Sequence, residues 1–155
     1  LAVTAFTLAH SITLALATLD IIHVPGPPVE AIIALSIVFV AQEVIQRQQG
    51  HAGLASRKPW LVAFAFGLLH GLGFAGALAE VGLPHNAIPL ALLFFNIGVE
   101  LGQLAFIAAV LGVTALLRRL WRGAATPRWA IPLQAYLIGG VASFWLIERI
   151  VGFWA

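Results

Sequence analysis

The chain contains neither cysteine nor methionine, and only 9% of its 155 residues are charged. Without cysteine, disulfide frameworks and thiolate metal sites are excluded, and Cu(I) loses its preferred sulfur ligands. Soluble domains carry about 25% charged residues, whereas 61% of this chain is hydrophobic. The composition therefore indicates an integral membrane protein, with room for a single transmembrane domain over residues 1–155.

Five apolar stretches are each long enough to cross a bilayer, which takes about 20 helical residues. We expect the three prolines of residues 23–28 to exclude helix there, and Pro59 is well placed to begin one. The fourth stretch exceeds the length of a span, which predicts a tilt or a break near Gly98 or Gly102. The sequence thus predicts an all-α, polytopic membrane helix bundle with five transmembrane helices, at about residues 2–22, 29–45, 59–80, 88–117 and 129–151.

Basic residues separate the second span from the third and the fourth from the fifth, while the other two loops have none. Cytoplasmic loops of membrane proteins carry an excess of Lys and Arg. The net charge of +2 is therefore a topological signal, and no nucleic-acid partner is expected. For the inner membrane of a bacterium, the rule predicts an outside C-terminus and cytoplasmic loops at residues 46–58 and 118–128.

The fourth span carries a polar stripe. Asn96, Glu100 and Gln103 stand at i, i+4 and i+7, on one face of a helix. Because an ionisable group in hydrocarbon costs about 2.5–3.5 kcal/mol, this face is turned away from lipid. Polar side chains also join helices to one another, but two amides and a carboxylate in one stripe favour the lining of a site.

Two histidines lie at the same predicted depth as this stripe. The segment ending in His10 resembles the one ending in His70, which suggests parallel repeats with a site between them. Gly67 and Gly71 form a GxxxG pair that lets another helix approach His70. We interpret His70 as aimed at a ligand between helices, although a packing motif with a carbonyl-bonded histidine is the alternative.

Two imidazoles, a carboxylate and amide oxygens suit a borderline divalent metal, which could be Ni²⁺, Co²⁺, Zn²⁺ or Mn²⁺. The predicted metal ligands are His10, His70, Asn96, Glu100 and Gln103. Further polar groups at other depths could line a path for the ion, namely Ser11, Glu43, Glu148, Asp20 and His23. The last two, with Glu30, Glu80 and His85, form either a capture vestibule or merely solvated helix ends, and the Ser11 hydroxyl can bond to its own backbone.

Several motifs resemble the HupE/UreJ family: FTLAHSITL from Phe6, VEAIIALSI from Val29, FGLLHGLGFA from Phe66, FNIGVELGQ from Phe95 and GVASFWLIER from Gly140. These are membrane proteins associated with hydrogenase and urease systems and regarded as nickel or nickel/cobalt permeases. The resemblance implies six or more helices, with a His-x5-Asp-His motif on an earlier helix that nothing here matches. Either that helix precedes Leu1 or the protein lacks it. Because the first span is predicted to start on the inside, we expect an earlier helix or an exported domain before Leu1.

Three classes of function remain open from the sequence. A permease or metal-binding membrane protein would have the metal ion as its substrate and polar groups at several depths. An intramembrane hydrolase would hold zinc and an activated water between His10, His70 and a carboxylate. A structural subunit would use the polar residues for packing alone. The sequence leaves open whether the chain forms a homo-oligomer.

Overall fold

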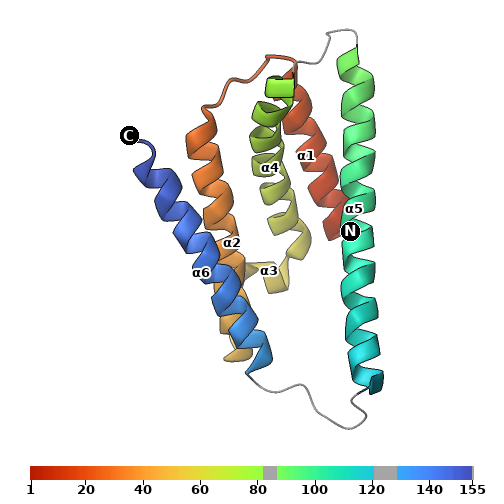
Figure 1. Ribbon diagram of the computed structural model, residues 1–155, viewed down its shortest axis with the longest axis vertical. Helices are drawn as coiled ribbons and strands as arrows, with labels where there is room; N and C mark the ends of the chain where they lie inside the picture. Colours follow the sequence, from red (N-terminus) through yellow and green to blue (C-terminus); the bar gives the residue numbers. More distant parts are fainter. Residues whose placement is uncertain (82–86, 121–128, 155) are drawn as a thin grey trace.

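Helices make up nearly all of the described chain. The computed structural model describes residues 1–81, 87–120 and 129–154, apart from the side chains of residues 77, 79–81 and 120. Within this part no strand occurs, and the predicted all-α class is confirmed. The helices are α1 (Ala2–Thr18), α2 (Gly26–Gln48), α3 (Leu54–Arg57), α4 (Pro59–Val81), α5 (Ile88–Leu120) and α6 (Ala130–Val151) (Figure 1).

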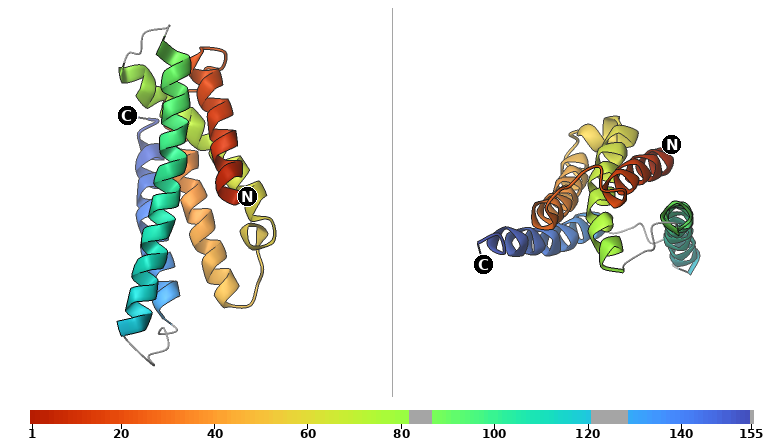
Figure 2. Two further views of the ribbon diagram at one scale, coloured as in Figure 1. Left: turned by 90° about the vertical axis from the view of Figure 1, so that its right-hand side faces the viewer. Right: turned by 90° about the horizontal axis from the view of Figure 1, so that it is seen from above.

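The five long helices form one row, in the order α6, α2, α4, α1, α5 (Figures 1 and 2). The most extensive contact is that between α1 and α4 at its centre. The row is balanced about this pair, since α2 packs against α4 and α5 packs against α1. The two helices that carry the similar histidine segments are therefore direct neighbours.

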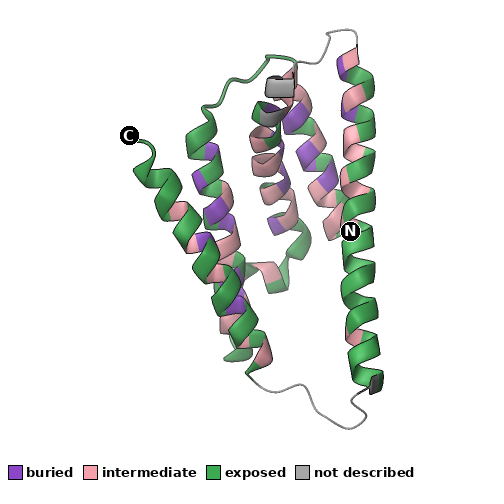
Figure 3. Cartoon of the chain, in the orientation of Figure 1, coloured by how far each residue is buried: buried purple, intermediate pink, exposed green. Residues whose placement is uncertain are grey.

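Four helices are long and apolar enough to cross a membrane by length and composition, namely α2, α4, α5 and α6, and α1 is a shorter apolar helix. The helices at the two ends of the row expose most of their surface (Figure 3). The exposed side chains are large and apolar, as with Phe106 at 71% and Phe144 at 64%. Such a surface fits hydrocarbon and not water, so the chain is a membrane protein.

Several predicted boundaries were wrong. Helix α1 ends at Thr18, four residues early, and Asp20 beyond it has a positive φ of 63°. Helix α2 already begins at Gly26, so Pro27 and Pro28 are helical. Proline is tolerated in a first turn because the N–H groups there have no partner within the helix.

Helix α5 runs without a break through Gly98 and Gly102, so the alternative of a broken fourth span is excluded. Its last turn carries Arg118 and Arg119.

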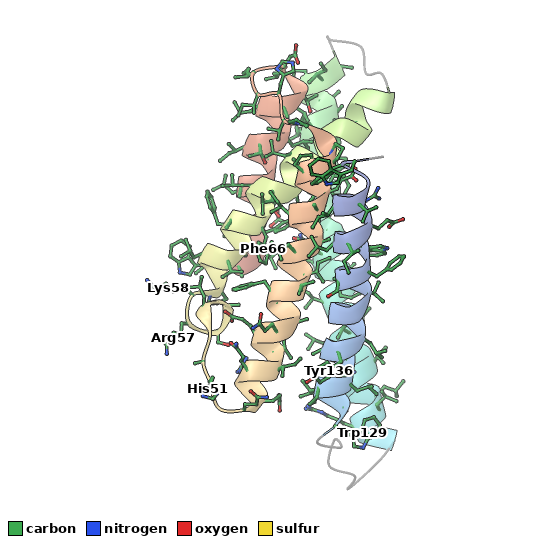
Figure 4. All side chains as sticks on the ribbon, turned by 90° about the vertical axis from the view of Figure 1, so that its left-hand side faces the viewer. His51, Arg57, Lys58, Phe66, Trp129 and Tyr136 are labelled. Carbon is green, nitrogen blue, oxygen red and sulfur yellow. The ribbon has the colours of Figure 1, made fainter. Side chains whose placement is uncertain are left out.

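Except for Arg149, the described lysines and arginines lie in the same half of the bundle. Figure 4 shows His51, Arg57 and Lys58 along one edge of that half, with Trp129, the residue before α6, at its lower end. Helix α5 ends on the same side, in its two arginines (Figure 1). Residues 121–128, the rest of the second predicted cytoplasmic loop, lie outside the described part. Which side of the membrane this end faces stays a prediction.

Candidate metal site

Two glycines allow α1 and α4 to approach closely. A Cβ added at Gly67 would collide with the carbonyl oxygen of Phe6, and one added at Gly71 with that of His10. The Thr13 hydroxyl crosses the same interface and donates to the Leu68 carbonyl oxygen at 2.8 Å. The prediction that these glycines bring another helix to His70 is confirmed, and that helix is α1.

His10 lies in an aromatic enclosure and is only 1% exposed. Its ring stacks between Phe6 and Phe95, with centroid distances of 5.9 and 6.0 Å and interplanar angles of 18° and 16°. Phe74 of α4 meets the ring at 5.6 Å, edge to face. Rings from α1, α4 and α5 thus keep water away from the imidazole.

Asn96 of α5 determines which nitrogen of His10 carries the proton. The Asn96 Nδ2 donates to the Leu92 carbonyl oxygen at 2.8 Å, which leaves its Oδ1 at 3.2 Å from His10 Nδ1. Because an amide oxygen only accepts, Nδ1 is the donor. The lone pair is then on Nε2, which is buried and has no hydrogen-bond partner within the described residues. A buried acceptor left in this way is costly unless a ligand meets it.

His70 has the same arrangement of proton and lone pair. Its Nδ1 lies 2.8 Å from the Phe66 carbonyl oxygen and must donate to it, so Nε2 is again the free acceptor. The half-buried ring borders a cavity of about 370 Å³, which Ser36 of α2 and Gln134 of α6 also line. The carbonyl bond is what the packing interpretation predicts, whereas the cavity beside the ring is what a ligand would need.

Phe6 separates the two imidazoles. Its ring centroid is 5.4 Å from that of His70, in an edge-on contact, and it stacks on His10. Among the residues that the structure describes, no three His, Asp or Glu side chains converge closely enough to hold a metal ion. A joint site of His10, His70 and Glu100 therefore stays a prediction.

The polar stripe of α5 meets the rest of the row unevenly. Asn96 contacts His10, whereas Glu100, one turn on, is half-buried. Gln103 borders a hollow of about 310 Å³ together with Phe6, and its Oε1 is buried without a hydrogen-bond partner in the described part of the chain. The stripe faces α1, as expected of a face turned from lipid.

Two of the proposed path residues are engaged locally. The Ser11 hydroxyl donates to the Thr7 carbonyl oxygen at 2.6 Å, which is the bond to its own helix that we considered. Glu43 is only 6% exposed, and its Oε2 accepts from the Ala55 N–H at 2.8 Å. Gly53 lies directly over this carboxylate, where no Cβ would fit. Glu43 thereby fixes α3 to α2.

The remaining path residues lie at the end of the bundle opposite to the one where α5 finishes in Arg118 and Arg119. Glu148 is exposed on α6. Asp20 and His23 contact each other through Oδ1 and Nε2, and both line a hollow of about 720 Å³ that Glu30 also borders. Two further residues of the predicted vestibule, Glu80 by its side chain and His85, lie outside the described residues.

Sequence reasoning missed several groups around the histidines. Phe6 was seen only as part of a motif, although its position four residues before His10 puts it on the same helix face. Ser36 and Gln134 line the cavity beside His70. A polar residue within an apolar span was the available signal for both, but on α2 and α6 only the carboxylates were considered as site residues.

Residues 1–149 match the model of the HupE/UreJ protein family. No curated protein and no solved structure matches the chain. The match spans nearly the whole sequence and confirms the resemblance seen in the motifs. Together with its apolar helices, it establishes that this membrane protein belongs to the HupE/UreJ family.

Proposed function

We propose that this protein binds a divalent transition metal ion, Ni²⁺ or Co²⁺, through side chains of α1, α4 and α5 and passes it across the membrane. One observation carries the proposal. The imidazoles of His10 and His70 lie on the two most closely packed helices, and each has its Nδ1–H bonded to an oxygen. Each ring therefore offers the Nε2 lone pair, the form in which imidazole binds metals.

The bonds at Nδ1 resemble those around histidine ligands in metalloproteins. A metal-binding histidine almost always donates its other ring N–H to a carbonyl or carboxylate oxygen, which fixes the tautomer. Here the Asn96 amide and the Phe66 carbonyl supply that oxygen. Glu100 and Gln103 follow Asn96 along α5 and could add oxygen ligands. Nitrogen and oxygen ligands without sulfur favour Ni²⁺, Co²⁺ or Zn²⁺ over Cu(I).

The ion is the substrate of this site, and its passage defines a direction. We propose that the half of the bundle with Arg47, Arg57 and Lys58 faces the cytoplasm, in keeping with the distribution of Lys and Arg in membrane proteins. The end that carries Asp20 and His23 is then the outer one.

The test is a titration of the purified protein in lipid nanodiscs with Ni²⁺ and with Mg²⁺, at two pH values. Free imidazole titrates near ~6.5, so Ni²⁺ affinity should fall as the medium is acidified below roughly pH 6, because protons compete for the lone pairs. Mg²⁺ binding, which uses oxygen ligands, should hardly respond.

His70→Ala should remove most of the affinity for Ni²⁺ and Co²⁺, while Leu68→Ala on the same helix should not. Affinity that survives both acid and His70→Ala would refute a histidine site and leave these residues as packing groups. Hydrolysis of a peptide or ester by the zinc-loaded protein, without ion flux, would favour the hydrolase instead.

A further inference from the structure

Two hollows lie in succession along the interface of α2 and α4. The first, here called the vestibule, has a volume of about 720 Å³ and is bordered by Glu30 of α2 and Gly73 of α4. The second, here called the His70 cavity, is bordered by Ser36 of α2 and His70 of α4. On each helix, the residue named for one hollow lies within two turns of the residue named for the other.

On α2, Ile33 stands in sequence between Glu30, which borders the vestibule, and Ser36, which borders the His70 cavity. Ile33 stands one turn beyond Glu30, and its Cδ1 lies 2.7 Å from the place that a Cβ on Gly73 would occupy. Val29 adds a second apolar contact at 3.7 Å from the same position. Ile33 thus uses the room left by the missing side chain of Gly73. Gly73 borders the vestibule and His70, three residues earlier on α4, borders the His70 cavity, so the contact lies where the two hollows approach each other.

The vestibule offers groups that attract a divalent cation. Asp20 and His23 form one contact pair. Across the hollow, Glu30 Oε2 lies 3.1 Å from Arg149 Nε, and both of these side chains are about half exposed. A cation arriving between Asp20 and His23 would compete with Arg149 for Glu30, because carboxylate and imidazole are common ligands of such ions.

We propose that Ile33, packed against Gly73, is a hydrophobic gate on an ion path that leads from the vestibule to His70. Apolar constrictions of this kind block ions by excluding water, and they open when the side chain moves aside. The position suits a gate because the blocking atom is the end of a rotatable side chain and not backbone. The identity of the ion rests on the function proposed above, whereas the gate itself is a property of water access.

Water access can be tested without any metal, because the chain has no cysteine. Ser36→Cys places one thiol in the His70 cavity, beyond Ile33, for labelling by a membrane-impermeant thiol reagent from the vestibule side. Adding Ile33→Ala should speed labelling on the order of tenfold, equivalent to a barrier lower by about 1.4 kcal/mol. The matched control is Ile32→Ala, since Ile32 is 44% exposed and faces away from the interface.

Ion flux gives the second readout. In proteoliposomes, Ile33→Ala should raise Ni²⁺ uptake, while Gly73→Ala, which presses on Ile33, should lower it. Gly76→Ala serves as the control because a Cβ there meets no described atom within 4 Å. None of these residues is a proposed ligand, so equilibrium Ni²⁺ affinity should stay unchanged.

The two readouts separate the two proposals. Labelling rates that are equal in Ile33→Ala and Ile32→Ala would overturn the gate, whatever the nickel results. Gly73→Ala guards against a trivial loss of fold, because its predicted effect is opposite to that of Ile33→Ala. If labelling responds to Ile33→Ala but the protein neither binds nor passes Ni²⁺, the gate stands and the proposed nickel function falls.

Discussion

The contact between α1 and α4 predicts a large penalty for one added methyl group. In Gly71→Ala the new Cβ would overlap the His10 carbonyl oxygen and the Thr13 hydroxyl. A backbone oxygen cannot rotate away, so the two helices must move apart. Overpacking costs about 1–3 kcal/mol, and loss of the bond from Thr13 to Leu68 adds roughly 0.6 kcal/mol, the mean for hydrogen bonds inside a membrane protein.

The free energy of unfolding should therefore fall by about 2–4 kcal/mol in Gly71→Ala. The assay is thermal unfolding in detergent micelles followed by far-UV circular dichroism, where this loss lowers the midpoint by roughly 4–16 °C. The control is Gly76→Ala on the same helix, where a Cβ meets nothing within 4 Å among the described residues. If Gly71→Ala melted together with Gly76→Ala, the close approach of α1 and α4 would be refuted.

Two further substitutions test side-chain contacts. Asn96→Ala should lower Ni²⁺ affinity by about 10–100-fold, the usual cost of removing a partner that orients a ligand. The control Ile97→Ala, at a 45% exposed position, should leave the affinity unchanged. Equal affinities of the two variants in a titration would contradict the role of the hydrogen bond between Asn96 and His10. Glu43→Ala should expose residues 49–58 to proteolysis, because the Ala55 N–H loses its acceptor at a cost of about 1–3 kcal/mol. Glu43→Gln retains an acceptor oxygen, so it should preserve both the protection from proteolysis and the Ni²⁺ affinity. If the Gln variant were as sensitive to protease as the Ala variant, the negative charge of Glu43 and not its hydrogen bond would hold this loop.

Much of the architecture could be predicted from the sequence, because backbone N–H and C=O groups in hydrocarbon must be hydrogen-bonded within the protein, which favours helices. The apolar stretches gave the long helices, and the GxxxG pair around His70 gave the close contact between α4 and α1. Helix ends were harder to predict. Two prolines suggested a turn at residues 27 and 28, yet both fit the first turn of α2, where no N–H is required.

The candidate site was only partly predictable. The periodicity of Asn96, Glu100 and Gln103 indicated one inward face, but it could not show that Asn96 alone would bond to His10. That choice depends on how α5 is rotated and shifted against α1, which no pattern within one helix determines. Glu43 was expected on an ion path, and its bond to Ala55 depends on the course of a loop whose sequence has no periodicity.

The unequal lengths of the helices have a consequence for the surrounding lipid. The 33 residues of α5 extend about 50 Å, more than the roughly 30 Å of a bilayer's hydrocarbon core. A hydrophobic helix that is too long for its bilayer tilts or thickens the lipid around it, so α5 should cross the membrane at a tilt, with Arg118 and Arg119 of its last turn among the headgroups. A thicker bilayer should then hold α5 more upright against α1.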